Sequence, residues 1–307
     1  CDRTRSRSCR ARGLVAQTDS MIGAAPPSVP QRCRQLLNQW EQSLELDERE
    51  ASLLAGERLA LKRQLQRLQL HHIRIAVIGR VGVGKSSLIN ALIGRNALVT
   101  DVAHGSTRHQ QAVVWDLEVP DIQQIDLIDT PGIDEISGAG RDRLASRMAK
   151  GADLILFVLD GDLTQAEHHA LTVLLDEGKA IQLVLNRCDR WRQDELQPLI
   201  DSIRSRLPKR SRDLPLIAVA AAPRQAMLHP DGTVSSEPMP AQIQPLENEL
   251  SDQLQRQGDL LLALNSLHQA DRFQASRQRL KLQRHRRAAQ GLIGRYAAAK
   301  ATGVAVN

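Results

Sequence analysis

The chain has 307 residues and a mass of 34.0 kDa, enough for one large or two ordinary domains with a buried core. Aliphatic side chains dominate the 42% apolar share, and the few aromatic residues argue against recognition through rows of stacked rings. No apolar run approaches the roughly 20 residues of a membrane-spanning helix. Four cysteines without ligand spacing exclude a zinc site and a disulfide framework, and they predict a reduced, cytoplasmic protein.

The net charge of +6 is concentrated at the two ends of the chain. Residues 1–12 contain five Arg and one Asp, and residues 267–307 contain nine Lys or Arg and one Asp. The long middle segment therefore carries a net negative charge. We expect any surface for nucleic acid or anionic lipid to lie at the termini.

The first 30 residues are rich in Arg and Ser and then in small residues and Pro, which predicts a disordered segment. This start is similar to an organellar transit peptide, but initiation at Met21 after an upstream artefact explains it equally well.

Residues 31–70 contain no Pro, and their apolar positions recur in steps of four and three. The spacing predicts one long amphipathic helix, interrupted, if anywhere, near Gly56. It either packs on its own domain or forms an intermolecular coiled coil, which would make the protein a homodimer.

Strand-like and helical patterns then alternate, which predicts an α/β fold with a doubly wound, mostly parallel sheet. The expected strands are residues 72–79, 111–119, 123–129, 152–160, 180–186 and 214–220. The expected helices follow the strand at 72–79 and also cover residues 141–149, 164–176, 192–207 and 243–266. The short link between 111–119 and 123–129 predicts that these two strands are antiparallel. Turn-forming residues fill 222–242 and predict a mobile loop.

The most specific motif is GRVGVGKSS at residues 79–87, between a predicted strand and a predicted helix. Its glycines let successive amides point inward, and the following helix adds the positive end of its dipole, so the motif predicts a site for two phosphates. Lys85 is expected to reach the β- and γ-phosphates, and the Ser86 hydroxyl to bind Mg²⁺. The predicted nucleotide contacts here are Gly79, Arg80, Val81, Gly82, Val83, Gly84, Lys85, Ser86 and Ser87.

Two further segments complete the expected phosphate site. In DTPG, residues 129–132, Asp129 is expected to hold Mg²⁺ through a water, and the Gly132 amide to bond the γ-phosphate. In GSTRH, residues 105–109, Thr107 is the preferred Mg²⁺ ligand, although Thr100 and Ser106 remain alternatives. With Lys85, Thr107 and Gly132 form the predicted catalytic set.

NRCD at residues 186–189 follows the predicted strand 180–186. The Asp189 carboxylate can accept N1–H and the 2-amino group of guanine, which adenine does not offer, so the motif predicts GTP rather than ATP. Asn186 is expected to tie this loop to the phosphate loop, and the stem of Arg187 to cover the base.

In order and spacing, these motifs resemble those of the translation-factor-related P-loop GTPases, most closely the Era-like bacterial branch. The resemblance covers residues 72 to about 266 and implies a Ras-like, Mg²⁺-dependent GTPase switch, so we expect a GTP-binding domain at 71–266. It also implies backbone contacts to guanine from Ala220 and Ala221, although the Ser expected in that segment is missing.

Three positions depart from the family pattern. Arg187 replaces a lysine, which puts nucleotide affinity in doubt more than base choice. Ile133 stands where many signalling GTPases have a water-positioning Gln, so we expect slow intrinsic hydrolysis. Gly82 replaces an Asn associated with potassium activation, so that mechanism is not carried over.

Residues 267–307 are expected to be a basic helical segment, the start of a further, membrane-associated domain such as similar bacterial GTPases carry. Its charge suits an anionic membrane surface, and RNA or ribosomal contact is the less favoured alternative. The leading hypothesis is a slow GTP-hydrolysing switch that binds GTP and GDP, cytoplasmic or peripheral to a membrane. A dynamin-like membrane-assembling GTPase and a ribosome-assembly GTPase remain its rivals.

Overall fold

The computed structural model describes residues 28–99, 110–134, 139–229 and 233–304. The α-helices are α1 (Val29–Gln42), α2 (Glu48–Leu53), α3 (Ala55–Gln69), α4 (Lys85–Leu92), α5 (Ala139–Gly151), α6 (Gln165–Asp176), α7 (Gln193–Arg206) and α8 (Gln244–Val304). The strands are β1 (His72–Gly79), β2 (Gln111–Trp115), β3 (Gln124–Asp129), β4 (Leu154–Leu159), β5 (Ala180–Leu185), β6 (Leu216–Ala218), β7 (Arg224–Leu228) and β8 (Val234–Pro238). Two short 3₁₀ helices are η1 (Cys188–Arg190) and η2 (Lys209–Ser211).

Six strands form the central sheet in the order β2-β3-β1-β4-β5-β6. All neighbours are parallel except β2 and β3, whose antiparallel register pairs Gln111 with Asp129 and Trp115 with Ile125. The predicted α/β fold and the antiparallel pair are therefore confirmed. The carboxyl ends of β1, β3, β4 and β5 meet at one edge of the sheet, where α/β folds bind ligands.

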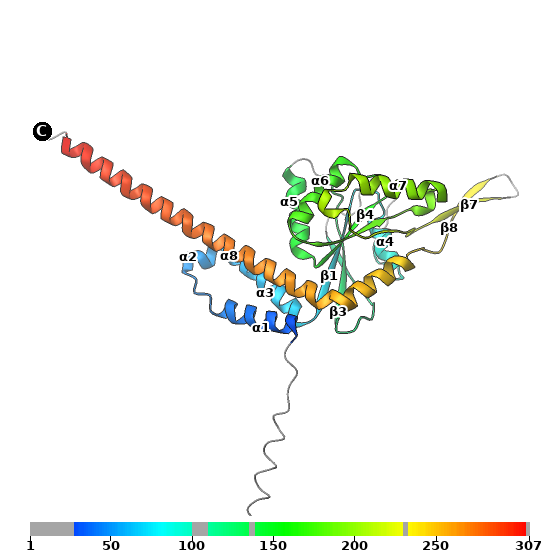
Figure 1. Ribbon diagram of the computed structural model, residues 1–307, viewed down its shortest axis with the longest axis horizontal. Coiled ribbons are helices and arrows are strands. Elements are labelled where there is room, and N and C mark those ends of the chain that lie inside the picture. Colours follow the sequence, from blue (N-terminus) through cyan, green and yellow to red (C-terminus); the bar gives the residue numbers. More distant parts are fainter. Residues whose placement is uncertain (1–27, 100–109, 135–138, 230–232, 305–307) are drawn as a thin grey trace, which may run out of the picture.

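The sheet is buried on both faces because its strands alternate between two apolar clusters. Along β1, Ile75 and Val77 lie in a cluster with residues of α4 and the first turns of α8, whereas Ala76 and Ile78 pack with α5, α6 and α7. Figure 1 shows helices on both sides of the sheet. Continuous apolar runs such as LILFVL in β4 reflect this two-sided burial.

The predicted single helix over 31–70 is wrong, because the structure divides this segment into α1, α2 and α3. Asp47 starts α2 by accepting a hydrogen bond from the Glu50 amide at 2.7 Å, which favours a new helix start over a continuing helix. The break allowed near Gly56 corresponds to the boundary between α2 and α3 at Leu54, and Gly56 itself lies in the first turn of α3. The apolar repeat instead packs on α8 of the same chain, where the Trp40 and Phe273 rings meet edge to face with centroids 6.1 Å apart.

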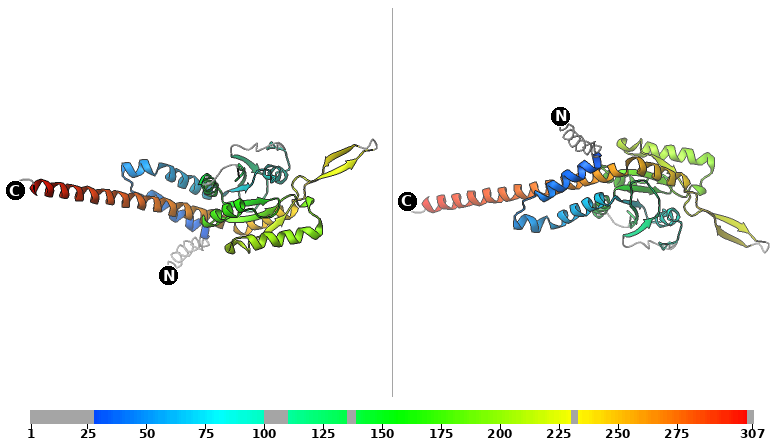
Figure 2. Two further views of the ribbon diagram at one scale, coloured as in Figure 1. Left: turned by 90° about the horizontal axis from the view of Figure 1, so that it is seen from above. Right: turned by 90° about the horizontal axis from the view of Figure 1, so that it is seen from below.

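The helix α8 runs without interruption from Gln244 to Val304, so the expected domain boundary between residues 266 and 267 falls inside one helix. Its first turns pack on the sheet and its middle packs against α1 and α3. Its last turns project away from the rest of the molecule (Figures 1 and 2). The basic segment is thus an extension of a helix that begins on the sheet.

The turn-rich segment 222–242, predicted as a loop, contains the antiparallel hairpin β7–β8 instead. Figure 2 shows this hairpin projecting from the sheet domain. Its strands are short, exposed and without a regular alternation of polar and apolar residues, which explains why the sequence pattern did not reveal them.

Candidate functional site

The Gly-rich loop between β1 and α4 needs glycine for two physical reasons. Gly82 and Gly84 have φ angles of +80° and +89°, in the left-handed region that other residues rarely adopt. A Cβ on Gly84 would also lie 2.4 Å from Asn186 Nδ2, and one on Gly79 would lie 2.4 Å from the Val158 carbonyl oxygen. The loop therefore fits closely between the ends of β4 and β5.

Lys85 opens α4 and is only 7% exposed. Its ammonium donates to the carbonyl oxygens of Gly79 and Arg80, at 3.1 and 2.7 Å. The side chain is therefore curled back over the loop, where the helix dipole and the ammonium both favour an anion. This is the placement that a phosphate-binding lysine requires.

A hydroxyl and a carboxylate meet beside the loop. Because β3 pairs with β1, it places Asp129 next to the first turn of α4, and the Ser86 hydroxyl donates to Asp129 Oδ2 at 2.6 Å. Asp129 is 1% exposed. Hard oxygen donors of this kind suit Mg²⁺, which takes one or two protein ligands and completes its shell with phosphate oxygens and water. These two residues therefore fit the ion predicted for them.

The DTPG segment lies directly against the Gly-rich loop. A Cβ on Gly132 would lie 2.7 Å from the Val81 amide nitrogen, and that amide donates to Asp134 Oδ1 at 2.7 Å. The Ile133 side chain is fully buried in the cluster under α5 and α6, so it points into the core. Thr107 and its alternatives Thr100 and Ser106 lie outside the described residues.

Asn186 joins three loops at the carboxyl end of β5. Its Nδ2 donates to the Val83 carbonyl at 2.9 Å, and its Oδ1 accepts from the Ala221 amide at 3.1 Å. The predicted tie between the NRCD segment and the Gly-rich loop is thus confirmed. Asp189 follows in η1, where it is exposed and lines the same hollow as Lys85.

The backbone contacts expected from Ala220 and Ala221 are not available in this structure. The Ala220 amide donates to the Gln242 carbonyl at 3.1 Å, and the Ala221 amide donates to Asn186. Both residues are buried. The next residue, Ala222, is exposed and lines the hollow, so it replaces them as the nearest backbone candidate.

The Gly-rich loop, the NRCD segment and Ala222 line one hollow of about 1220 Å³. The β7–β8 hairpin adds Arg224, Ser236 and Pro238 to its wall. The sequence did not indicate this contribution, because it depends on strand pairing within a segment that resembles a loop. The volume is sufficient for a nucleotide-sized ligand.

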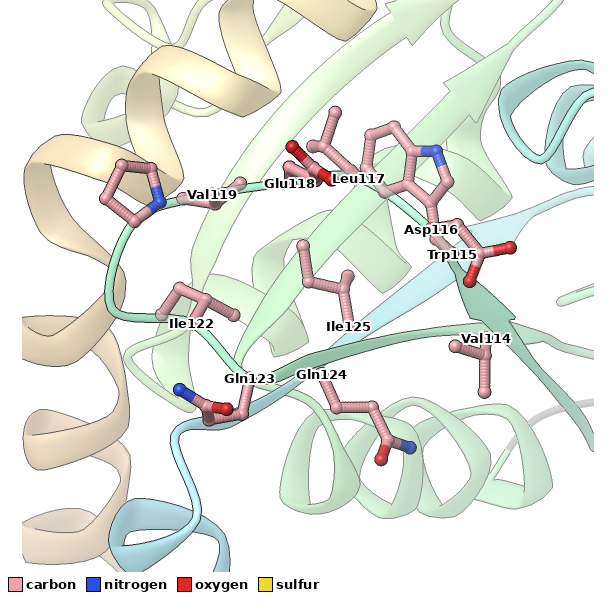
Figure 3. A pocket seen from close by; sticks show the side chains of 11 residues that line it. Val114, Trp115, Asp116, Leu117, Glu118, Val119, Ile122, Gln123, Gln124 and Ile125 are labelled. Carbon is pink, nitrogen blue, oxygen red and sulfur yellow. The ribbon is translucent and has the colours of Figure 1, made fainter.

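A second hollow, of about 800 Å³, surrounds the β2–β3 connection (Figure 3). It lies beside Trp115 and Ile125, at the opposite end of β3 from Asp129. A Cβ on Gly258 of α8 would lie 2.9 Å from the Ile122 side chain, so the helix packs closely on this connection. The position of this hollow, away from the carboxyl ends of the strands, separates it from the candidate site.

A group of ion pairs connects the two halves of the candidate site. Asp160, directly after β4, contacts Arg80 Nη2 at 2.9 Å through Oδ1 and Arg187 Nη1 at 3.2 Å through Oδ2. Arg80 Nε also contacts the fully buried Glu167 at 2.8 Å. Burial alone would lower the pKa of Arg80, but the hydrogen bond and charge of Glu167, together with the charges of Asp160 and Asp134, raise that pKa. Sequence reasoning missed Asp160, although it directly follows β4 at the edge of the sheet where Asp129 ends β3.

Comparison with known proteins gives matches over the same part of the chain. Residues 74–187 match the family described as 50S ribosome-binding GTPase. The GTPase Era of Lactobacillus delbrueckii subsp. bulgaricus is 32% identical over 136 residues, which cover 42% of this chain and 43% of the relative. The GTPase Era of Stenotrophomonas maltophilia is 34% identical over 129 residues, covering 40% and 42%.

A solved structure described as Era in complex with MgGDPNP and nucleotides 1506–1542 of 16S ribosomal RNA is 25% identical. It covers 53% of this chain and 61% of its own, with a TM-score of 0.42. The chain spans less than half the length of the curated relatives it matches.

Proposed function

We propose that this chain, whose residues 74–187 form a P-loop GTPase domain of the Era-like kind, is a molecular switch that binds GTP and GDP with Mg²⁺ and hydrolyses GTP slowly. The observation that carries the proposal is the set of hydrogen bonds made by the Asn186 side chain. It holds the Gly-rich loop, the NRCD loop and the segment at Ala221 around one hollow. This arrangement supports a phosphate site and a base site held at a fixed separation.

Each residue of the proposed phosphate site has a distinct role. Lys85 exchanges its carbonyl partners for β- and γ-phosphate oxygens, and the amides of residues 82–87 bind the same anions. The Gly132 amide senses the γ-phosphate, which couples the following segment to hydrolysis. Ser86 and, through a water, Asp129 would hold Mg²⁺, which would neutralise charge on the phosphates.

At the base end, Asp189 selects guanine and the Arg187 stem covers the ring. Slow hydrolysis follows from Ile133, because a side chain buried in the core cannot orient water. Thr107 remains the proposed second direct protein ligand of Mg²⁺, beside Ser86. A contact between Ala222 and the guanine oxygen replaces the one first expected from Ala220 and Ala221.

Titration of the purified protein with a fluorescent GDP analogue, with Mg²⁺ and with EDTA, tests this function. We expect Mg²⁺-dependent saturation that unlabelled GTP reverses and ATP does not. Lys85→Ala should abolish the signal, whereas Lys150→Ala, at an exposed position on α5, should leave it unchanged. Saturation that ATP reverses as well as GTP would contradict the base assignment.

A second proposed property is peripheral binding to an anionic membrane through the end of α8. Among the described residues, no helix is long and apolar enough to cross a bilayer. The projecting turns nevertheless expose Leu292, Ile293 and Tyr296 close to Arg286 and Arg287, a combination suited to a membrane surface.

Sedimentation with phosphatidylglycerol vesicles, with and without a GTP analogue, tests the membrane proposal. We expect binding that Arg286→Gln with Arg287→Gln weakens, and that the matched change Arg204→Gln with Lys209→Gln on the sheet domain does not. Greater binding and self-association with the GTP analogue would support the dynamin-like, homodimeric form. Sedimentation with ribosomal particles but not with vesicles would overturn the membrane proposal in favour of an RNA partner.

A further inference from the structure

Arg187 stands in a constrained position at the wall of the hollow. Its backbone has a φ of +60°, an uncommon conformation for a residue with a side chain, and it lies between Asn186 and the start of η1. The backbone therefore fixes where the side chain leaves the chain. A long side chain at this point still needs a partner to fix its guanidinium.

Asp160 is that partner, and it has a second one in the Gly-rich loop. Its two carboxylate oxygens face different arginines, Oδ1 towards Arg80 and Oδ2 towards Arg187. One carboxylate therefore connects a residue of the phosphate loop with a residue of the base loop, although the two are more than 100 positions apart in the sequence.

The connection is anchored in a buried helix start. Glu167 is fully buried and accepts from Arg80 Nε through Oε1, while its Oε2 accepts from the amide and hydroxyl of Thr164, the N-cap of α6. A capping box of this kind holds the Glu167 carboxylate in place. The sequence of contacts is thus Glu167, Arg80, Asp160 and Arg187, from the rigid core to the pocket wall.

The contact between Asp160 and Arg187 suits an arginine better than the lysine that the family pattern has at position 187. A guanidinium offers several planar donors, so Arg187 can keep one donor on Asp160 while its stem and its other donors face the pocket. A lysine ammonium is a compact charge on a flexible stem. Asp160 and Arg187 keep about 19% and 32% of their side chains exposed, so the pair is only partly screened by water.

We propose that Asp160 is a positioning residue for guanine nucleotide binding, acting by holding the Arg187 side chain at the base end of the hollow in register with the phosphate loop. The inference rests on the proposed function. It requires that removing the Asp160 charge weakens nucleotide binding only while Arg187 is present.

A double-mutant cycle on the full chain tests this, with fluorescent GDP affinity as the measurement. Asp160→Asn should weaken binding about tenfold, as expected for the loss of a charged hydrogen bond. Arg187→Ala should weaken it by a similar factor, and adding Asp160→Asn to Arg187→Ala should cost less than twofold more. Asp160→Glu, which retains the charge, should recover part of the loss.

Asp162→Asn is the matched control. Asp162 follows Asp160 in the same loop, but its carboxylate pairs with Arg206 and Ser202, and neither of these residues lines the hollow. It should leave the affinity within twofold of the wild-type value. Thermal unfolding without nucleotide verifies that each variant is folded. If the effects of Asp160→Asn and Arg187→Ala multiply, Asp160 acts through Arg80 or through stability and the inference is wrong. If the unmodified protein binds no guanine nucleotide, the proposed function itself fails.

Discussion

The two glycines with positive φ in the Gly-rich loop differ in their surroundings. A Cβ on Gly84 would collide with Asn186 Nδ2, whereas nothing lies within 4 Å of a Cβ on Gly82. Gly84→Ala should therefore displace the Asn186 side-chain amide, which ties the NRCD loop to the Gly-rich loop, and abolish nucleotide binding. Gly82→Ala should add only backbone strain, of about 1–2 kcal/mol, and retain weakened binding. Fluorescent GDP titration of both variants distinguishes them, and equal losses would contradict this account.

The base assignment depends on one carboxylate. Replacing Asp189 by Asn removes one acceptor and introduces a donor, so GTP should bind about 100-fold more weakly because a guanine donor loses its partner. Xanthosine triphosphate, which carries a carbonyl in place of the 2-amino group, should gain affinity for the same variant. Competition against fluorescent GDP measures both. Unchanged GTP affinity would show that Asp189 does not contact the base.

Among single residues, the sequence alone predicted those site residues that belong to motifs with a fixed local spacing. The motifs at 79–87, 129–132 and 186–189 were found because each has a fixed order of residue types after a strand. Asp160 was missed because its role depends on contacts with Arg80 and Arg187, both distant in the sequence. The hydrogen bond from the Ala220 amide to the Gln242 carbonyl could not be predicted either, because it forms only when the β7–β8 hairpin returns the chain to Ala220.

Among the elements, the N-terminal helices depend on α8 for their burial. Phe273 is fully buried between α1 and α3, in the cluster that includes Leu37 and Leu61. Phe273→Ala should reduce stability by about 3–5 kcal/mol, because it leaves a cavity at the centre of this cluster. Hydrogen exchange should then accelerate in α1 more than in β4.

The matched control on the same helix is Leu282→Ala, at a side chain that is 59% exposed. It should change stability by less than about 0.5 kcal/mol. Uniform acceleration of exchange throughout the sheet in the Phe273→Ala variant would show that the helices and the sheet domain unfold as one unit.

Strand periodicity revealed the elements of the sheet, since six apolar runs became its six strands. The helix breaks at 43–47 were not found, because the apolar repeat continues through them and only the capping contacts of Asp47 show the interruption. The β7–β8 hairpin escaped for the opposite reason. Neither face of its strands is buried, and pairing alone defines them.

For the molecule as a whole, a partly buried lysine marks the place where α8 joins the sheet. Lys179 donates to the Ala152 carbonyl at 2.9 Å and to Asn265 Oδ1 at 2.6 Å. Burial lowers its pKa to about 8, although the charge of Asp153 opposes this shift. In the unfolded chain the pKa returns to the ordinary value of 10.5. The unfolded state therefore binds more protons between these two values.

This difference predicts that the contribution of Lys179 to the free energy of unfolding rises with pH from about 8 to 10.5. Lys179→Met removes the titration, so its urea-unfolding free energy should rise less between pH 8 and 10 than that of the unmodified protein. Lys150→Met, at an exposed position, should show the unmodified slope. Identical slopes for all three proteins would contradict a lowered pKa at Lys179.

The central claim is that Lys85, Ser86 and Asp189 face one hollow that holds a magnesium-bound guanine nucleotide. Isothermal titration of the full chain with GDP in Mg²⁺ tests it most directly, with Asp189→Asn and Lys85→Ala titrated in parallel. The account predicts one site per chain, strongly weakened by either substitution. No heat of binding in the unmodified protein, or binding that both variants retain in full, would contradict it.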